Sequence, residues 1–199
     1  CISVIIPPFQ SPDELDHVKR AYLLTRGTFI LHAPQGGKPG GMIDSGLSSY
    51  IEAYDNLRFH SDRKLSAEQI SAANAISWTG SKEFSQARVT SYYFPLIYAR
   101  QAIGLVLGEA LGFSVDRSFR LARLLTLFVS SVLACSAFLI YPTSPLVGAL
   151  LIIQMSLFQL SSASLDGMAT AMSIFAISLF MRIVDERNHA KPWHLYGLT

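Results

Sequence analysis

The sequence contains little charge. Of its 199 residues only 15% are charged, whereas 50% are hydrophobic and the mean hydropathy is +0.34. A soluble domain ordinarily carries roughly 25% charged residues, so this composition argues against one and indicates a membrane protein. The charges that are present nearly balance, with 16 Lys and Arg against 14 Asp and Glu. No nucleic-acid partner is expected, because proteins that hold nucleic acid concentrate basic residues.

Cysteine is scarce as well. Cys1 and Cys135 cannot build a disulfide framework, and Cys135 lies in an apolar run, where it behaves as a small hydrophobic residue. Residues 1–6 are apolar but far fewer than the ~20 that a membrane span requires. We interpret them as the end of a truncated transmembrane helix. A lipidated cysteine and a signal-peptide remnant are the alternatives.

Charge is distributed unevenly along the chain. Residues 124–181 contain a single charged side chain, that of Asp166, and a stretch of this length can hold two spanning helices. Residues 7–93 instead carry nine basic and nine acidic residues. They are predicted to form a long extracytoplasmic loop with short helices, in which the glycine-rich residues 36–41 are a flexible stretch.

The predicted fold is all-α, a polytopic transmembrane helical bundle. The expected membrane helices cover residues 94–113, 121–140, 146–160 and 167–184, followed by a cytoplasmic loop over residues 185–199. The third of these is expected to be short or re-entrant, because 15 residues extend only ~22 Å as a helix, against a hydrocarbon core of ~30 Å.

Basic residues in short loops predict the orientation, because such loops stay in the cytoplasm. The arginines between residues 117 and 123 follow the first apolar segment, which places them inside and residues 7–93 outside. The basic residues between 182 and 191 are expected inside too. Both conditions hold only if residues 146–160 do not cross fully, which leaves Asp166 on the outer face.

The residues after the first proline pair predict the start of a helix. Ser11 and Glu14 have the S-x-x-E spacing of a capping box, and Pro12 occupies the first turn, where its missing N–H costs nothing. Asp13 and Glu14 would also complement the positive end of the helix dipole. A purely structural role therefore explains much of this motif.

The same motif has a functional interpretation. Asp13, His17 and Arg20 follow one another at i, i+4 and i+7, on one side of a helix that starts just after a presumed membrane exit. Such a set could accept a proton from a hydroxyl group, bind a divalent cation through Asp13 and hold a phosphate through Arg20. The alternative is an Asp13–His17 pair on a solvated face, which contributes only tenths of a kcal/mol.

Two further charged residues stand in apolar surroundings. Asp166 is expected to face water, a cation or a partner, because an unpaired carboxylate at membrane depth is costly. A helix-capping role is the alternative. Arg100 lies inside the first apolar segment, where it either pairs with an anion or extends its guanidinium to the interface.

The sequence resembles the bacterial polytopic family catalogued as domain of unknown function 2142. The similar motifs occur in the same order over nearly the whole chain. They are Pro12-Asp13-Glu14 with His17 and Arg20-Ala21-Tyr22, Tyr93-Phe94-Pro95 with Tyr98, Arg123-Leu124, and Gln154-Met155-Ser156 with Ser162-Ala163-Ser164-Leu165-Asp166. The family usually has a proline where this chain has Gln154, a difference that concerns helix geometry more than chemistry.

The layout of that family is similar to the C-type (GT-C) integral-membrane glycosyltransferases, which use polyprenyl-phosphate-linked sugars. The resemblance implies that Asp13 is the general base or a metal ligand, with Glu14 beside it, and that Asp166 is the second acidic group. It implies that the phosphate of the lipid donor is neutralised by His17, Arg20 or Arg100. A divalent cation, Mg²⁺ or Mn²⁺, would bind Asp13 and Asp166. The implied partners are membrane lipids and a polyprenyl-phosphate-linked sugar, in the bacterial cytoplasmic (inner) membrane.

Two other functions are compatible with the sequence. In a multi-pass transporter or flippase subunit, Arg100, Glu109 and Asp166 would line one pathway across the membrane. In a non-catalytic membrane assembly protein, residues 7–93 would bind a partner and both carboxylates would be dispensable.

Overall fold

The computed structural model describes residues 6–57, 60, 62–142 and 144–185. The predicted end of a truncated helix at residues 1–6 and the predicted cytoplasmic loop at 185–199 thus fall almost entirely outside the described residues. The elements are α2 (Glu14–Thr25), β1 (Gly40–Asp44), α3 (Ser45–Asp55), α4 (Ala67–Asn74), β2 (Lys82–Gln86), η1 (Pro95–Tyr98), α5 (Ala99–Ala110), α6 (Val115–Ile140), α7 (Pro145–Leu151), α8 (Gln154–Leu160) and α9 (Asp166–Asp185). The protein is mostly helical, and a small sheet departs from the all-α prediction.

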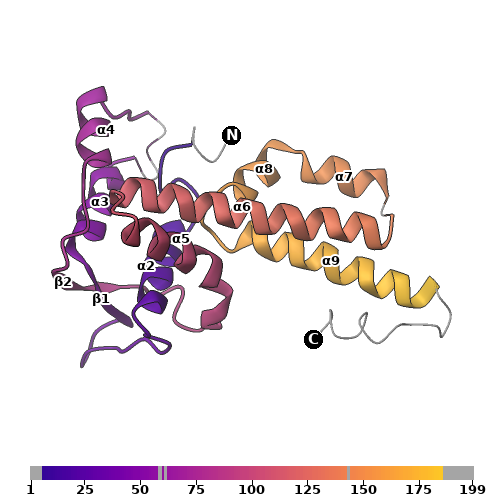
Figure 1. Ribbon diagram of the computed structural model, residues 1–199, viewed down its shortest axis with the longest axis horizontal. Coiled ribbons are helices and arrows are strands. Elements are labelled where there is room, and N and C mark those ends of the chain that lie inside the picture. Colours follow the sequence, from indigo (N-terminus) through magenta and orange to yellow (C-terminus); the bar gives the residue numbers. More distant parts are fainter. Residues whose placement is uncertain (1–5, 58–59, 61, 143, 186–199) are drawn as a thin grey trace.

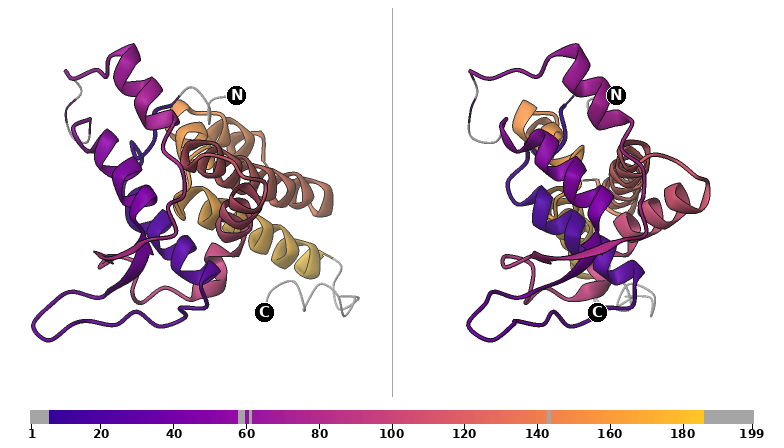
Figure 2. Two further views of the ribbon diagram at one scale, coloured as in Figure 1. Left: turned by 60° about the vertical axis from the view of Figure 1, so that its left-hand side comes forward. Right: turned by 90° about the vertical axis from the view of Figure 1, so that its left-hand side faces the viewer.

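The molecule has two parts that share α6 (Figure 1). Residues 6–57, 60 and 62–123 form a folded unit, the head, which contains the helices α2 to α5, both strands and the first third of α6. Residues 124–142 and 144–185 form the stem, in which the rest of α6 extends away from the head beside α7, α8 and α9. Seen from the side of the head, α4 lies at one edge and the sheet at the opposite edge, with α2 and α3 between them (Figure 2, right).

The first third of α6 belongs to the core of the head. Phe119 is fully buried, and its ring centroid lies 5.0 Å from that of Phe9 and 5.9 Å from that of Tyr50. The Tyr50 hydroxyl also donates a hydrogen bond of 2.8 Å to Asp116 at the start of the helix. Together these contacts anchor the apolar stem in the head.

Residues 94–113 do not form the single long helix expected from their hydropathy. They form η1 and α5, and the 12 residues of α5 extend only ~18 Å, less than the hydrocarbon thickness. α5 instead packs on α6 within the head, where a Cβ added at Gly104 would lie 2.5 Å from the Cα of Ala122. Arg123, which was expected across the membrane from residues 7–93, pairs directly with Glu14 of the head.

Gly40 and Gly41, expected in a flexible stretch, begin β1. The strand pairs antiparallel with β2 and places Met42 opposite Phe84. Both glycines are needed for this approach, since a Cβ at Gly40 would lie 2.2 Å from a backbone oxygen of β2 and one at Gly41 would lie 2.6 Å from Leu23. Backbone pairing with β2, and the lack of side chains at Gly40 and Gly41, thus make this segment a strand.

The stem presents small residues inward and large apolar residues outward. Ser130 and Ala137 of α6 and Ala171 of α9 are buried, whereas Phe128 is 65% exposed and Phe180 57% exposed. Small residues let two helices approach closely, as is typical of helices that pack in lipid. Among the described residues, α6 and α9 are the two helices long and apolar enough to cross a membrane.

Residues 146–160, expected as one short helix, are divided into α7 and α8 by Ile152 and Ile153. Figure 1 shows that the two helices carry the chain from the far end of α6 back to the head. α9 therefore begins beside the head, at Asp166, and runs in the same direction as α6. Its bounds differ from the predicted 167–184 by one residue at each end.

Candidate functional site

Asp13 precedes α2 in a backbone conformation that frees its side chain. Its φ of 57° lies in the left-handed region, which Asp tolerates better than most residues. The carboxylate is exposed and makes no capping hydrogen bond. The predicted capping box does not form either, because the Ser11 hydroxyl has no hydrogen-bond partner among the described residues. Asp13 is thus the N-cap of α2 by position only, because its side chain makes no hydrogen bond to the first turn.

Glu14 has the opposite environment. Its carboxylate is fully buried and accepts hydrogen bonds from Arg123 Nε at 2.9 Å, Arg123 Nη2 at 2.8 Å and the Ala163 backbone N–H at 2.6 Å. Arg123 in turn donates to the carbonyl oxygens of Ile6 and Pro7. Glu14 thus fixes α2 to α6 and to the segment before α9, and its oxygens are engaged in this bracing.

Asp166 is positioned by the buried segment that Glu14 holds. The carbonyl oxygen of Ala163 accepts a hydrogen bond of 2.7 Å from the Gln101 side chain, and the hydroxyls of Ser162 and Ser164 lie 2.8 Å apart. These contacts attach residues 161–165 to α5. Asp166, the next residue, starts α9 with its carboxylate exposed at the junction of head and stem.

Several of the predicted site residues act electrostatically on His17. Burial lowers the pKa of its imidazole, the carboxylates of Asp13, Asp166 and Glu14 raise it, and the Arg100 guanidinium lowers it. Each of these charges is therefore close enough to act on the ring. Residues far apart in the sequence thus act on the same ring.

Tyr98 is a member of this group that the sequence did not single out as a site residue. Its fully buried hydroxyl lies 3.1 Å from His17 Nδ1, and burial raises its pKa, so it is neutral at physiological pH. In the sequence it stood out only as part of a motif shared with the family that the chain resembles. Arg20, by contrast, is directed away from the group, because its two terminal nitrogens donate to the carbonyls of Thr28 and Phe29 at 2.9 and 2.6 Å.

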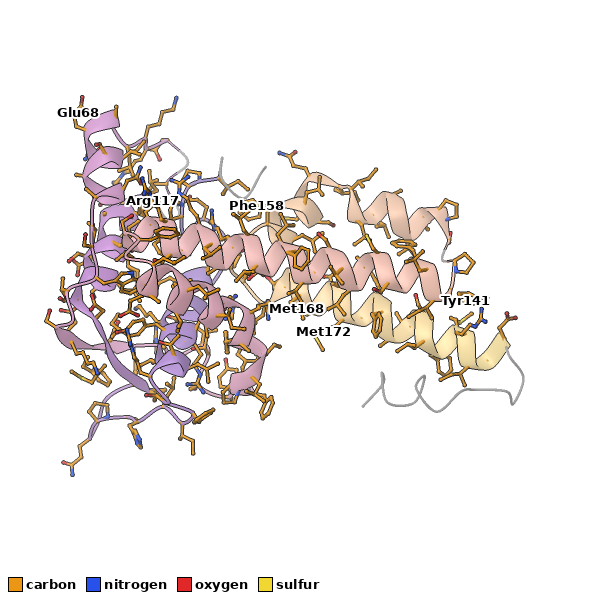
Figure 3. The ribbon with its side chains drawn as sticks, in the orientation of Figure 1. Glu68, Arg117, Tyr141, Phe158, Met168 and Met172 are labelled. Atoms are coloured by element: carbon orange, nitrogen blue, oxygen red, sulfur yellow. The ribbon has the colours of Figure 1, made fainter. Side chains whose placement is uncertain are left out.

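Arg100 is a buried cation at the foot of an apolar groove. It donates hydrogen bonds to the carbonyls of Ile97 and Ser164, and no carboxylate among the described residues pairs with it. Burial lowers its pKa to about 10, so it remains charged at neutral pH. The groove of about 420 Å³ lies between η1 and the stem, where Met168 and Met172 of α9 line it (Figure 3).

Comparison with known proteins, like the apolar stem, indicates a membrane protein. Residues 1–199 match the family described as "Predicted membrane protein (DUF2142)". The chain belongs to this family. No curated protein and no solved structure matches it.

The carboxylates of this DUF2142 protein suit a divalent cation only in part. Within the described residues, no three His, Cys, Asp or Glu side chains gather closely enough to hold a metal ion. Asp13 and Asp166 supply two exposed carboxylates, and both act electrostatically on His17. Two carboxylates fit Mg²⁺, which commonly combines one or two of them with water and substrate phosphates.

Proposed function

We propose that this DUF2142 protein is a GT-C-like glycosyltransferase that takes its sugar from a polyprenyl-phosphate donor during cell-envelope glycan assembly in the bacterial inner membrane. The observation that carries the proposal is that the charges of Asp13, Asp166 and Arg100 all act on the buried His17 ring, in a head from which the apolar stem extends (Figure 1). Sugar transfer from a lipid phosphate needs a base for the acceptor, a positive charge for the leaving phosphate and access from the membrane. Each requirement has a candidate here.

Asp13 is the proposed general base. Its carboxylate is exposed and makes no capping bond, so it can accept the proton of an acceptor hydroxyl. Asp166 is the proposed second acidic group on the facing segment. Glu14, beside Asp13, acts as a positioning residue instead, because its oxygens are occupied by Arg123 and Ala163.

Arg100 is the proposed partner of the leaving phosphate. Its groove offers apolar walls to a polyprenyl chain and one buried cation to the phosphate at its end, and stabilising such developing charge is a large part of catalysis. His17 is mostly neutral because burial lowers its pKa, so it would serve as a hydrogen-bond donor to the phosphate. Mg²⁺ or Mn²⁺ held by Asp13 and Asp166 would supply further positive charge there.

The orientation we propose places the head and Asp166 outside and the far end of α9 in the cytoplasm. Arg182, in the last turn of α9, then obeys the positive-inside rule. Because α7 and α8 return the chain to the head, this orientation does not require that residues 146–160 stop short of crossing the membrane. A long polar segment such as the head can be translocated regardless of its charge.

The transporter alternative finds less support. It requires Glu109 to share a pathway with Arg100 and Asp166. Glu109 instead forms an ion pair of 2.5 Å with Arg26, and both side chains are about one-third exposed on the head. We therefore favour the transferase.

Sugar transfer by the Asp13→Asn and Asp166→Asn variants tests the proposal. With the full-length protein in membranes and a radiolabelled polyprenyl-phosphate sugar, each variant is expected to lose activity by about 100-fold or more, the usual contribution of a general base. Glu83→Gln, on exposed β2, is the matched control and should retain it. Transfer within threefold of wild type in both Asn variants would rule the proposal out.

A further inference from the structure

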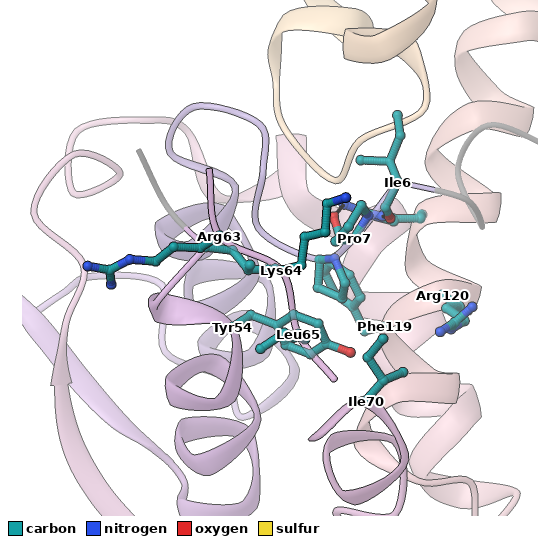
Figure 4. Close-up of a pocket in the computed structure, with 12 residues that line it drawn as sticks. Ile6, Pro7, Tyr54, Arg63, Lys64, Leu65, Ile70, Phe119 and Arg120 are labelled. Atoms are coloured by element: carbon teal, nitrogen blue, oxygen red, sulfur yellow. Dashed lines mark hydrogen bonds between the residues drawn. The ribbon is translucent and has the colours of Figure 1, made fainter. Parts of the chain in front are cut away.

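A second cavity lies away from Asp13 and Asp166. Its volume is about 330 Å³, and it opens between residues 6–8, the loop that leads into α4 and the buried third of α6 (Figure 4). The side chains of Tyr54, Leu65, Ile70 and Phe119 give it largely apolar walls. None of the proposed catalytic or phosphate-binding residues lines it. A cavity of this size accommodates a small organic ligand.

The charged residues that line this cavity are all basic: Arg63, Lys64, Arg120 and Arg123. Arg123 is neutralised by Glu14 and Arg120 by Asp116, at 2.8 and 2.7 Å. Arg63 and Lys64 pair with no carboxylate among the described residues. The lining that the structure describes therefore carries surplus positive charge.

The geometry points to a binding site for a small organic phosphate. A phosphate monoester carries a charge of about −1.5 to −2 at pH 7, more than that of a carboxylate, and so suits this basic lining better. Lys64 extends over the cavity toward Ile6 and Pro7, and Arg63 extends outward from the same loop (Figure 4). Arg120 uses Nε for Asp116, which leaves its terminal nitrogens for the phosphate. The organic part of the ligand packs on the apolar walls.

The cavity also borders the Glu14–Arg123 ion pair, which holds the start of α2 next to Asp13. Arg123 contributes to its lining and holds Glu14, the residue next to Asp13. A bound phosphate therefore lies beside the pair that fixes the start of α2. The inference does not rest on sugar transfer, because binding is measured directly.

Calorimetric titration of phenyl phosphate into the purified protein in phosphatidylcholine nanodiscs tests the site. Saturable binding is expected, and Arg63→Ala/Lys64→Ala should weaken it at least about tenfold, because both unpaired cations are lost. Lys38→Ala/Arg88→Ala, which removes two exposed cations outside the cavity, should leave the Kd unchanged within twofold. Both pairs are exposed, so the fold is retained.

Two further titrations identify the source of the phosphate. Inorganic phosphate should bind at least about tenfold more weakly than phenyl phosphate, because it makes no use of the apolar walls. Phosphatidic acid in the nanodisc competes with phenyl phosphate if the natural ligand is a lipid headgroup and does not compete if it is a soluble compound. Absence of saturable binding by both phosphates and phosphatidic acid, or equal weakening in the two double variants, would overturn the inference.

Discussion

Neutralising Glu14 should destabilise the head strongly. Glu14→Gln leaves the buried Arg123 guanidinium without its counterion and weakens three hydrogen bonds of 2.6 to 2.9 Å. Breaking a buried ion pair costs about 3–5 kcal/mol. In a chain of this length each kcal/mol lowers Tm by about 2–4 °C, so the midpoint should fall by about 10 °C. The assay is thermal unfolding in detergent, followed by far-UV circular dichroism and tryptophan fluorescence.

The exposed pair Arg26–Glu109 provides the matched control. Its side chains are 34% and 32% exposed, and such pairs contribute about 0–1 kcal/mol, so Glu109→Gln should lower Tm by at most a few degrees. Adding Arg123→Met to Glu14→Gln should recover part of the loss, because the double variant buries no unpaired charge. An equal fall in Tm for Glu14→Gln and Glu109→Gln would refute the reasoning.

Further variants test the backbone at Asp13, the packing of α5 on α6 and the protonation of His17. Asp13→Gly should keep the wild-type Tm, because glycine adopts a φ of 57° freely, whereas Asp13→Ala should lower the free energy of unfolding by about 1 kcal/mol. On our proposal both variants lose sugar transfer. An alanine variant that is destabilised but active would contradict the proposal. Gly104→Ala should lower Tm by several degrees, because its Cβ would lie 2.5 Å from the Cα of Ala122. The control Gly148→Ala, whose Cβ would have no atom within 4 Å, should leave Tm unchanged. Equal midpoints for the two variants would disprove the close packing of α5 on α6. Because burial lowers the pKa of His17, the unfolded state binds its proton more readily, and stability should be lost as pH falls below about 6.5. His17→Gln should make Tm less dependent on pH between 7.5 and 5, and parallel curves would contradict this.

The long apolar helices were readable from the sequence because hydropathy is a local property. The predicted spans 121–140 and 167–184 fall within α6 and α9. Residues 94–113 have a similar composition, but Gly104 and Gly108 let α5 lie against α6, and this tertiary packing keeps the segment in the head. The sheet was missed because its strands are five residues long and one begins with two glycines.

The candidate site was only partly readable. Asp13, His17 and Asp166 stood out by their local context, and in the structure both carboxylates act on the His17 ring. The pairing of Glu14 with Arg123 joins residues 109 positions apart, and no local pattern indicates such a partner. Arg20 had the right helical spacing, but the turn after α2 supplies two carbonyl acceptors that spacing alone does not reveal.

The central claim is that Asp13 and Asp166 form one site on the same side of the membrane as the head. Single cysteines at positions 13 and 166, in a protein whose native Cys1 and Cys135 are replaced by serine, can be treated in intact cells with a membrane-impermeant maleimide. We expect both to be labelled from outside, and a cysteine at Ser144, at the far end of α6, to be labelled only after permeabilisation. Labelling of positions 13 and 166 from opposite sides would contradict the account.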